Sequence, residues 1–127
     1  MNKSRLTGNE DVLISGHEIV NPNVFVPKYV LFYITVNPQN IEVKRRLKDF
    51  ESLRSLLKKF FPTSQIPHLE RCSRLSETEP ATIKKQTLFL ESFLNDLIMK
   101  TGMKSKLVEE FLLCKDLDIL KKLFKEY

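Results

Sequence analysis

The spacing of apolar residues predicts a strand-rich first part of the chain and a helical second part. Apolar positions alternate with other positions over residues 30–36, as in a half-buried strand. Turn residues follow at 37–40, and a second alternation over residues 41–45 predicts the returning strand of a hairpin. Apolar residues between 12 and 19 indicate an earlier strand, which Gly16 interrupts. We therefore expect a three-stranded antiparallel meander with one face that needs to be covered.

From residue 49 the apolar spacing changes from two residues to three or four, which predicts a helix over residues 49–60. Its apolar face would consist of Phe50, Leu53, Leu57 and Phe60. This face supplies the cover that the sheet needs. Proline and the residue before it avoid helical conformation, so Pro62 and Pro67 predict an extended loop that continues to about Glu79.

Three more helices are predicted after this loop. Pro80 suits the first position of a long helix that ends near residues 101–102, with residue 78 or 79 as its N-terminal cap. Shorter helices are expected over residues 107–112 and 117–124. The predicted fold class is α+β: a three-stranded meander packed against a helical subdomain, with a proline-containing loop between them.

Size and composition are typical of one domain with one core. The chain has 127 residues, and 42% of them are hydrophobic, which excludes wholesale disorder. Residues 1–10 are polar and predict a flexible N-terminal arm, so residues 11–127 are expected to form the single domain. Cys72 and Cys114 have no metal-type spacing, and we expect free thiols in a reducing compartment.

The charge of the chain favours an anionic partner. The formal net charge is +5 at pH 7, which suits a phosphoinositide membrane, an acidic protein or a nucleic acid. Because 16 acidic residues are mixed with the basic ones, nonspecific nucleic-acid binding is disfavoured and no nucleic acid is expected as a partner. The sequence contains neither an apolar run of membrane-spanning length nor a secretory signal, which predicts a cytoplasmic protein.

The candidate chemistry lies where the third strand meets the first helix. Lys44, Arg45 and Arg46 come directly before this junction, and an arginine held there can bind a phosphate through two parallel hydrogen bonds. By strand alternation Arg45 should point to the opposite face from Arg46, which leaves Arg46 as the better candidate. Asp49 is interpreted as a helix cap.

No pattern in the sequence indicates catalysis. His17 and His68 belong to no metal-ligand motif, and the sequence has no Gly-x-Ser-x-Gly element, no Cys/His signature and no glycine-rich phosphate loop. We therefore expect neither an enzyme nor a bound cofactor.

The segment Arg45–Leu53 resembles the hallmark of the phox-homology (PX) domains: a basic pair, a spacer, then Asp and Phe, and a leucine-containing helix. The proline-containing stretch from Phe61 to Leu69 and the pattern Leu90–Leu94 resemble later parts of the same family. The resemblance extends roughly from Val12 to Phe124. It implies a non-enzymatic module that binds phosphoinositides.

The resemblance also implies roles for individual residues. Arg46 occupies the place of the arginine that contacts the 3-phosphate of phosphatidylinositol 3-phosphate. Leu47 stands where an aromatic residue usually packs on the inositol ring. A lysine of the family falls on Cys72, with Arg71 and Arg74 near enough to substitute. The arginine that usually holds the inositol hydroxyls falls on Gln86, which can still hydrogen-bond.

The expected binding residues are therefore Arg46, Leu47, Arg71, Arg74 and Gln86. The leading hypothesis is a module that targets its parent protein to endosomal or vacuolar membrane, as sorting nexins do, through a phosphoinositide headgroup. Two alternatives stay open. One is a degenerate PX fold that binds a protein partner. The other is a weak, nonspecific binder of anionic membranes, whose binding would fall steeply with salt.

Overall fold

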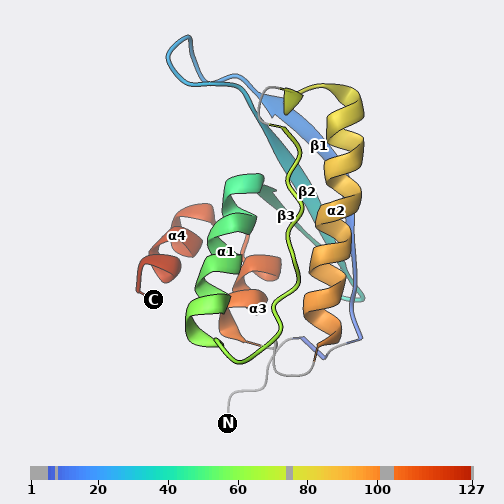
Figure 1. Cartoon of the computed structure of the whole chain (residues 1–127), viewed down its shortest axis with the longest axis vertical. Coiled ribbons are helices and arrows are strands. Elements are labelled where there is room, and N and C mark those ends of the chain that lie inside the picture. Colours follow the sequence, from blue (N-terminus) through green and yellow to red (C-terminus); the bar gives the residue numbers. More distant parts are fainter. Residues whose placement is uncertain (1–5, 8, 74–75, 101–104, 127) are drawn as a thin grey trace.

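The computed structural model describes residues 6–7, 9–73, 76–100 and 105–126. Within these residues, three strands come first and four helices follow (Figure 1). The strands are β1 (Asp11–Val20), β2 (Tyr29–Asn37) and β3 (Ile41–Arg46), and the helices are α1 (Leu47–Phe60), α2 (Pro80–Met99), α3 (Lys106–Leu113) and α4 (Leu117–Glu126). The extended loop predicted after the first helix joins α1 to α2. The predicted α+β class is confirmed.

The sheet is the predicted antiparallel meander, in the order β1-β2-β3. The β1–β2 register shifts between Ile14 and Gly16. At this bulge a Cβ on Gly16 would lie 3.2 Å from the ring of Tyr33, so a larger residue would require the ring to move. In the β2–β3 turn Asn40 has a φ of 54°, a left-handed conformation that asparagine tolerates better than most residues.

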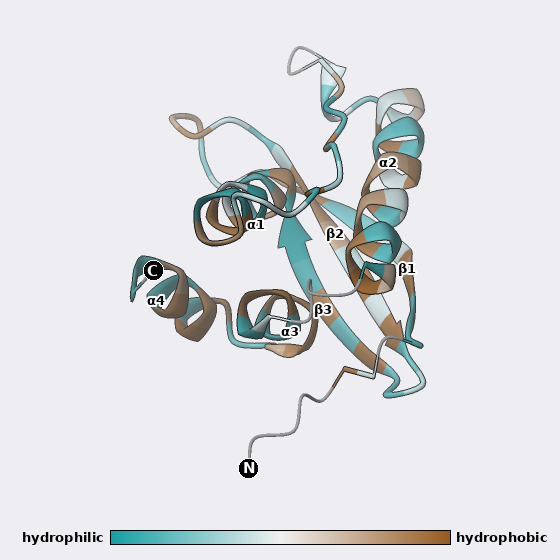
Figure 2. Cartoon of the chain, turned by 60° about the horizontal axis from the view of Figure 1, so that its bottom comes forward, coloured by the Kyte–Doolittle hydropathy of each residue, from teal (hydrophilic) through white to brown (hydrophobic). Residues whose placement is uncertain are grey.

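One face of the sheet forms the floor of the core. Alternate residues of β2 are buried on this face: Val30, Phe32, Ile34 and Val36. The buried Phe50 of α1 packs edge-on against Phe93 of α2 and Phe111 of α3, at centroid distances of 6.4 and 5.0 Å. Figure 2 shows the apolar sides of these helices turned toward the sheet. The sheet face that was predicted to need covering is thus covered by α1, α2 and α3.

Two side chains of α2 bind the backbone of β1. The Asn95 amide accepts a hydrogen bond from the Val12 N–H at 3.2 Å and donates one to the Val12 carbonyl at 2.8 Å. The Glu91 carboxylate accepts from the Ile14 N–H at 2.6 Å. These contacts satisfy backbone groups at the free edge of the sheet, which would otherwise be open to another strand. They also hold α2 alongside β1.

Helix α1 begins two residues earlier than predicted, because Arg46 and not Asp49 is the capping residue. Asp49 is the third helical residue, and its carboxylate accepts a hydrogen bond from the Arg46 N–H at 2.9 Å. An acidic side chain at this position reaches back and satisfies a backbone donor outside the first turn. Helix α2 begins at Pro80 with Glu79 as cap, as expected. The end predicted near residues 101–102 lies outside the described residues.

Part of the arm expected over residues 1–10 contacts the domain. Leu6 is buried in the core, and Glu10 is buried as well. The Glu10 carboxylate accepts hydrogen bonds from the Thr7 N–H at 2.9 Å and from the Gln39 amide at 2.8 Å. Gln39 lies in the β2–β3 turn, so Glu10 links Thr7 to the turn of the hairpin.

Candidate binding site

Arg45 and Arg46 are adjacent in sequence but point to opposite sides of β3. Arg45 is 1% exposed. Its guanidinium donates to the Phe111 carbonyl at 3.1 Å, to the Lys44 carbonyl at 2.7 Å and to the Cys114 carbonyl. Burial lowers the pKa of Arg45, and the nearby Asp49 carboxylate partly opposes this effect. Arg45 therefore holds the end of α3 against β3, and its donors are used inside the fold.

Arg46 lies at the surface, and its guanidinium is stacked on an aromatic ring. Its central carbon is 3.8 Å from the centroid of the Tyr29 ring, at the start of β2. Such stacking is favourable and holds the guanidinium in one plane. Within the described part of the chain, the guanidinium makes no hydrogen bond or ion pair. It can therefore offer two parallel N–H groups to a phosphate.

Arg46 and Tyr29 line an open pocket of about 460 Å³. The β1–β2 loop provides one wall, the first turn of α1 another, and the proline-containing loop a third. Its basic residues are Lys28, Arg46, Lys48 and Arg71, and its acidic residues are Glu51 and Glu77. The pocket opens at the N-terminus of α1, where backbone N–H groups and the helix dipole favour an anion. The pocket has the charge and position of an anion-binding site.

The structure brings three of the five predicted residues to this pocket. Leu47 is the first residue of α1, is 4% exposed, and forms part of the pocket floor. Arg71 lines the pocket from the loop and forms an ion pair with Glu51 of α1. That pair fixes the Arg71 side chain against α1 and leaves only part of its charge available to a ligand. Arg74 lies outside the described residues.

Gln86 lies outside the pocket that Arg46 lines. It is 4% exposed, and both ends of its amide bind the backbone of the proline-containing loop. The amide oxygen accepts from the Cys72 N–H at 2.8 Å, and the amide nitrogen donates to the Glu70 carbonyl at 2.8 Å. Through these two bonds Gln86 positions the loop segment that carries Arg71.

Replacing Gln86 with leucine is expected to lower the free energy of unfolding by about 1–3 kcal/mol, because the Cys72 N–H and the Glu70 carbonyl lose their partners. Urea denaturation followed by circular dichroism measures the change. Gln65→Leu, at an exposed position in the same loop, is the control and should leave stability within about 0.5 kcal/mol. If Gln86→Leu weakened lipid binding at unchanged stability, Gln86 would be a ligand contact.

Sequence reasoning missed Tyr29, although the pairing of the strands could have indicated it. Leu31 of β2 pairs with Arg46 of β3, so Tyr29 is the diagonal neighbour of Arg46 on the same face. This depends on the register of the hairpin. The alternation fixes which face each side chain is on, but registers that differ by two residues keep the same faces.

A second missed feature is the tip of the β1–β2 loop. Val24 and Phe25 are 91% and 92% exposed. The Asn23 side chain accepts hydrogen bonds from the backbone N–H groups of Phe25 and Val26, at 2.8 and 3.1 Å, which give the tip a defined turn. The loop extends from the end of the sheet (Figure 1), and its tip is hydrophobic (Figure 2). Residues 26–28 of the same loop line the pocket, so the apolar tip and the basic pocket lie together.

An antiparallel meander, a covering set of helices and a basic pocket at the β3–α1 junction are the features of a PX domain. A sequence model of the PX domain family matches residues 34–115. The chain belongs to this family. The predicted resemblance is thereby confirmed.

Similar proteins agree with this assignment. Sorting nexin-41 of Candida albicans is 35% identical over 103 residues, a match that covers 74% of this chain and 15% of that protein. The chain thus spans a small part of its curated relative. The crystal structure of a designed CISK-PX domain is 25% identical, with a TM-score of 0.67 over 80% of this chain and 96% of that one. The solution structure of the Vam7p PX domain has the same fold, with a TM-score of 0.52 at 20% identity over 80% of this chain and 93% of that one.

Family membership supports a membrane-targeting module in trafficking, since PX domains are generally non-enzymatic modules that bind phosphoinositides in membranes. None of the described helices combines the length and the apolar character needed to cross a bilayer.

Proposed function

We propose that this domain binds a phosphoinositide headgroup in the pocket lined by Arg46, with phosphatidylinositol 3-phosphate as the preferred lipid. The observation that carries the proposal is the Arg46 guanidinium, stacked on Tyr29 at 3.8 Å and without an internal acidic partner among the described residues. A guanidinium held in this way is ready to bind a phosphate without first breaking an ion pair.

The surrounding residues have supporting roles in this proposal. Lys28 and Lys48 add positive charge at the mouth of the pocket, and Leu47 provides an apolar surface beneath the inositol ring. Arg71 contributes from the loop that Gln86 positions, although it shares its charge with Glu51. Arg74, two residues after Cys72 in the sequence, stays a candidate on the resemblance alone. The parent protein would then attach peripherally to endosomal or vacuolar membrane and act in trafficking.

The exposed tip of the β1–β2 loop supplies the apolar anchor in this arrangement. A bilayer whose headgroup occupied the pocket would meet Val24 and Phe25 at the same time, because residues 26–28 connect them to the pocket wall. Burying one phenylalanine side chain contributes about 1.5–3 kcal/mol. Headgroup recognition and partial insertion of the tip would therefore reinforce each other.

Phe25→Ser is expected to weaken binding to vesicles that contain phosphatidylinositol 3-phosphate by about 10- to 100-fold, because the inserted apolar surface is lost. Stability should not change, since Phe25 is 92% exposed. Leu88→Ser, at a 61% exposed leucine of α2, is the control and should bind like the wild type. Equal binding of the two variants, measured by vesicle sedimentation, would exclude insertion of the tip.

The experiment that tests the proposed function is vesicle sedimentation with each phosphoinositide in turn, at matched total charge and at two salt concentrations. Selective binding to vesicles with phosphatidylinositol 3-phosphate supports the proposal. Binding that follows total lipid charge and falls steeply with salt would instead indicate nonspecific adhesion. Absence of binding to every lipid would favour a PX fold that binds a protein partner.

A further inference from the structure

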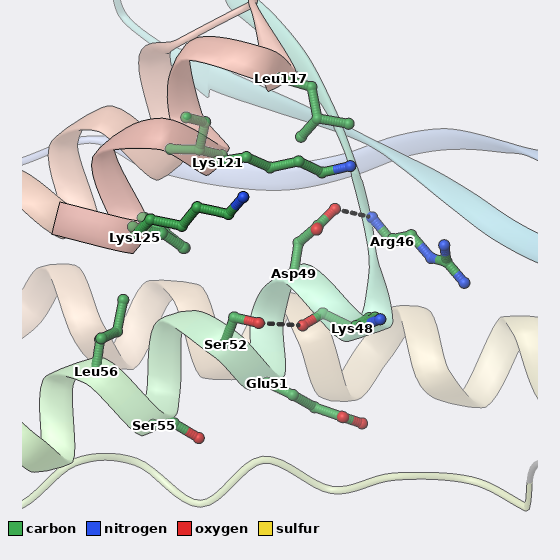
Figure 3. Close-up of a pocket in the computed structure, with 12 residues that line it drawn as sticks. Arg46, Lys48, Asp49, Glu51, Ser52, Ser55, Leu56, Leu117, Lys121 and Lys125 are labelled. Carbon is green, nitrogen blue, oxygen red and sulfur yellow. Dashed lines mark hydrogen bonds between the residues drawn. The ribbon is translucent and has the colours of Figure 1, made fainter. Parts of the chain in front are cut away.

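A second and larger hollow lies between α1 and α4. It is a groove of about 670 Å³, within the range typical of ligand sites. Arg46 and Lys48 border both this groove and the Arg46 pocket. In Figure 3 the Arg46 guanidinium points away from the groove, whereas Lys121 and Lys125 extend from α4 toward the end of the groove where Asp49 lies. The groove is therefore a separate surface that adjoins the pocket.

The groove has apolar walls. Leu56 of α1 lines the groove together with Leu117 and Phe124 of α4, and all three are only partly buried. Leu120 is the buried residue that anchors α4. The apolar side of α4 thus packs on α1 through its centre and leaves apolar surface uncovered on both sides of Leu120. This surface is available to a further apolar group.

The charge of the groove is positive because its lining has more basic residues than acidic ones. Asp49 accepts a hydrogen bond from the Arg46 N–H, and Glu51 pairs with Arg71. Within the described residues, the basic side chains at the groove form no ion pair; these are Lys48, Lys121 and Lys125. Lys121 and Lys125 are four residues apart, so they lie on one side of α4, about 6 Å apart along its axis.

We propose that this groove binds an acidic amphipathic segment of a partner protein. Apolar side chains of the segment, at helical spacing, would contact Leu56, Leu117 and Phe124, and its carboxylates would pair with the three lysines. The apolar residues are recessed between two helices, unlike the projecting Val24 and Phe25. A flat bilayer cannot reach recessed residues as a narrow segment can. The groove would thus add a protein partner to a domain that is also proposed to bind a lipid.

The probe for this proposal is a fluorescein-labelled 14-residue peptide with leucines at a spacing of three and four and glutamates between them. Two matched peptides, one with lysine for every glutamate and one with serine for every leucine, test charge and apolar contact separately. Fluorescence anisotropy with the whole chain gives the affinity. We expect the glutamate–leucine peptide to bind at least tenfold more tightly than either control. In a nuclear magnetic resonance titration it should shift residues of α1 and α4 that line the groove.

The chain offers a closely matched pair of variants. Lys121→Glu changes a groove residue, and Lys122→Glu makes the same change of charge one position along α4, where the side chain does not line the groove. We expect Lys121→Glu to weaken peptide binding by about tenfold and Lys122→Glu by about twofold or less, the latter through the change in net charge alone. Both lysines are exposed, so both variants should fold.

Three outcomes would overturn the proposal. The two variants could weaken binding equally, or the lysine peptide could bind as well as the acidic one. The third outcome is lipid binding: Lys121→Glu, but not Lys122→Glu, reduces sedimentation with phosphatidylserine vesicles, while the peptide shifts no groove residue. Because these vesicles contain no phosphoinositide, failure here leaves the proposed function of the Arg46 pocket untouched.

Discussion

Arg46→Ala is expected to weaken binding to vesicles with phosphatidylinositol 3-phosphate by about 10- to 150-fold. A charge-assisted hydrogen bond to a phosphate contributes about 1.5–3 kcal/mol, and this guanidinium is already oriented by Tyr29. The fold should be unchanged, because the Arg46 side chain makes no hydrogen bond or ion pair within the described residues. Its cap bond to Asp49 comes from the backbone N–H, which alanine keeps.

Lys44→Ala is the control for this prediction. It removes the same charge two residues earlier in β3, from a side chain that contacts Glu18 at 3.6 Å and lies 5.0 Å from the Tyr33 ring, away from the pocket. Sedimentation of both variants separates the site from net charge. A similar small loss in each would mean that Arg46 acts only through its charge, and the proposed phosphate contact would then be wrong.

Arg45→Met is expected to lower the free energy of unfolding by about 3 kcal/mol, with little direct effect on the lipid site. The Arg45 guanidinium donates to the carbonyls of Phe111 and Cys114, at the end of α3. Carbonyls in the last turn of a helix have no partner within the helix, and leaving one buried and unpaired costs about 1–3 kcal/mol. Methionine keeps much of the apolar contact with the Phe111 ring, so the loss reports mainly on the hydrogen bonds.

Urea denaturation measures this effect, with Lys44→Met as the exposed control, expected within about 0.5 kcal/mol of the wild type. Should Arg45→Met fail to fold, Arg45→Lys keeps a charged donor and is expected to recover part of the stability. An Arg45 variant with wild-type stability but lost lipid binding would reverse the roles that we assign to the two arginines.

These two predictions concern neighbouring arginines that the sequence could separate only in part. Alternation along β3 places Arg45 and Arg46 on opposite faces, and this was predicted correctly. It does not say which carbonyls the inner arginine would meet, because Phe111 and Cys114 are more than 60 residues away. Long-range hydrogen bonds of this kind depend on how α3 packs, which no local pattern encodes.

In the candidate site, too, the sequence predicted some features and left others to the packing of the fold. The resemblance to the PX family drew attention to Arg46, Leu47 and Arg71, and all three line one pocket. It also aligned Gln86 with a ligand-binding arginine, but an uncharged amide close to the loop satisfies the backbone of residues 70 and 72 instead. The shorter side chain is buried under the loop, where its hydrogen bonds lie within the protein.

The sequence by itself determined the order and type of the elements. Side chains return to the same face every two residues in a strand and every three or four in a helix, and these periods are local properties of the backbone. The charge pattern also located the basic junction between β3 and α1. The tertiary structure alone decided that Tyr29 supports Arg46, that Phe25 projects beside the pocket and that α4 leaves a basic groove against α1. Each of these features needs strand register or helix packing to bring distant residues together, and that arrangement follows from the whole core.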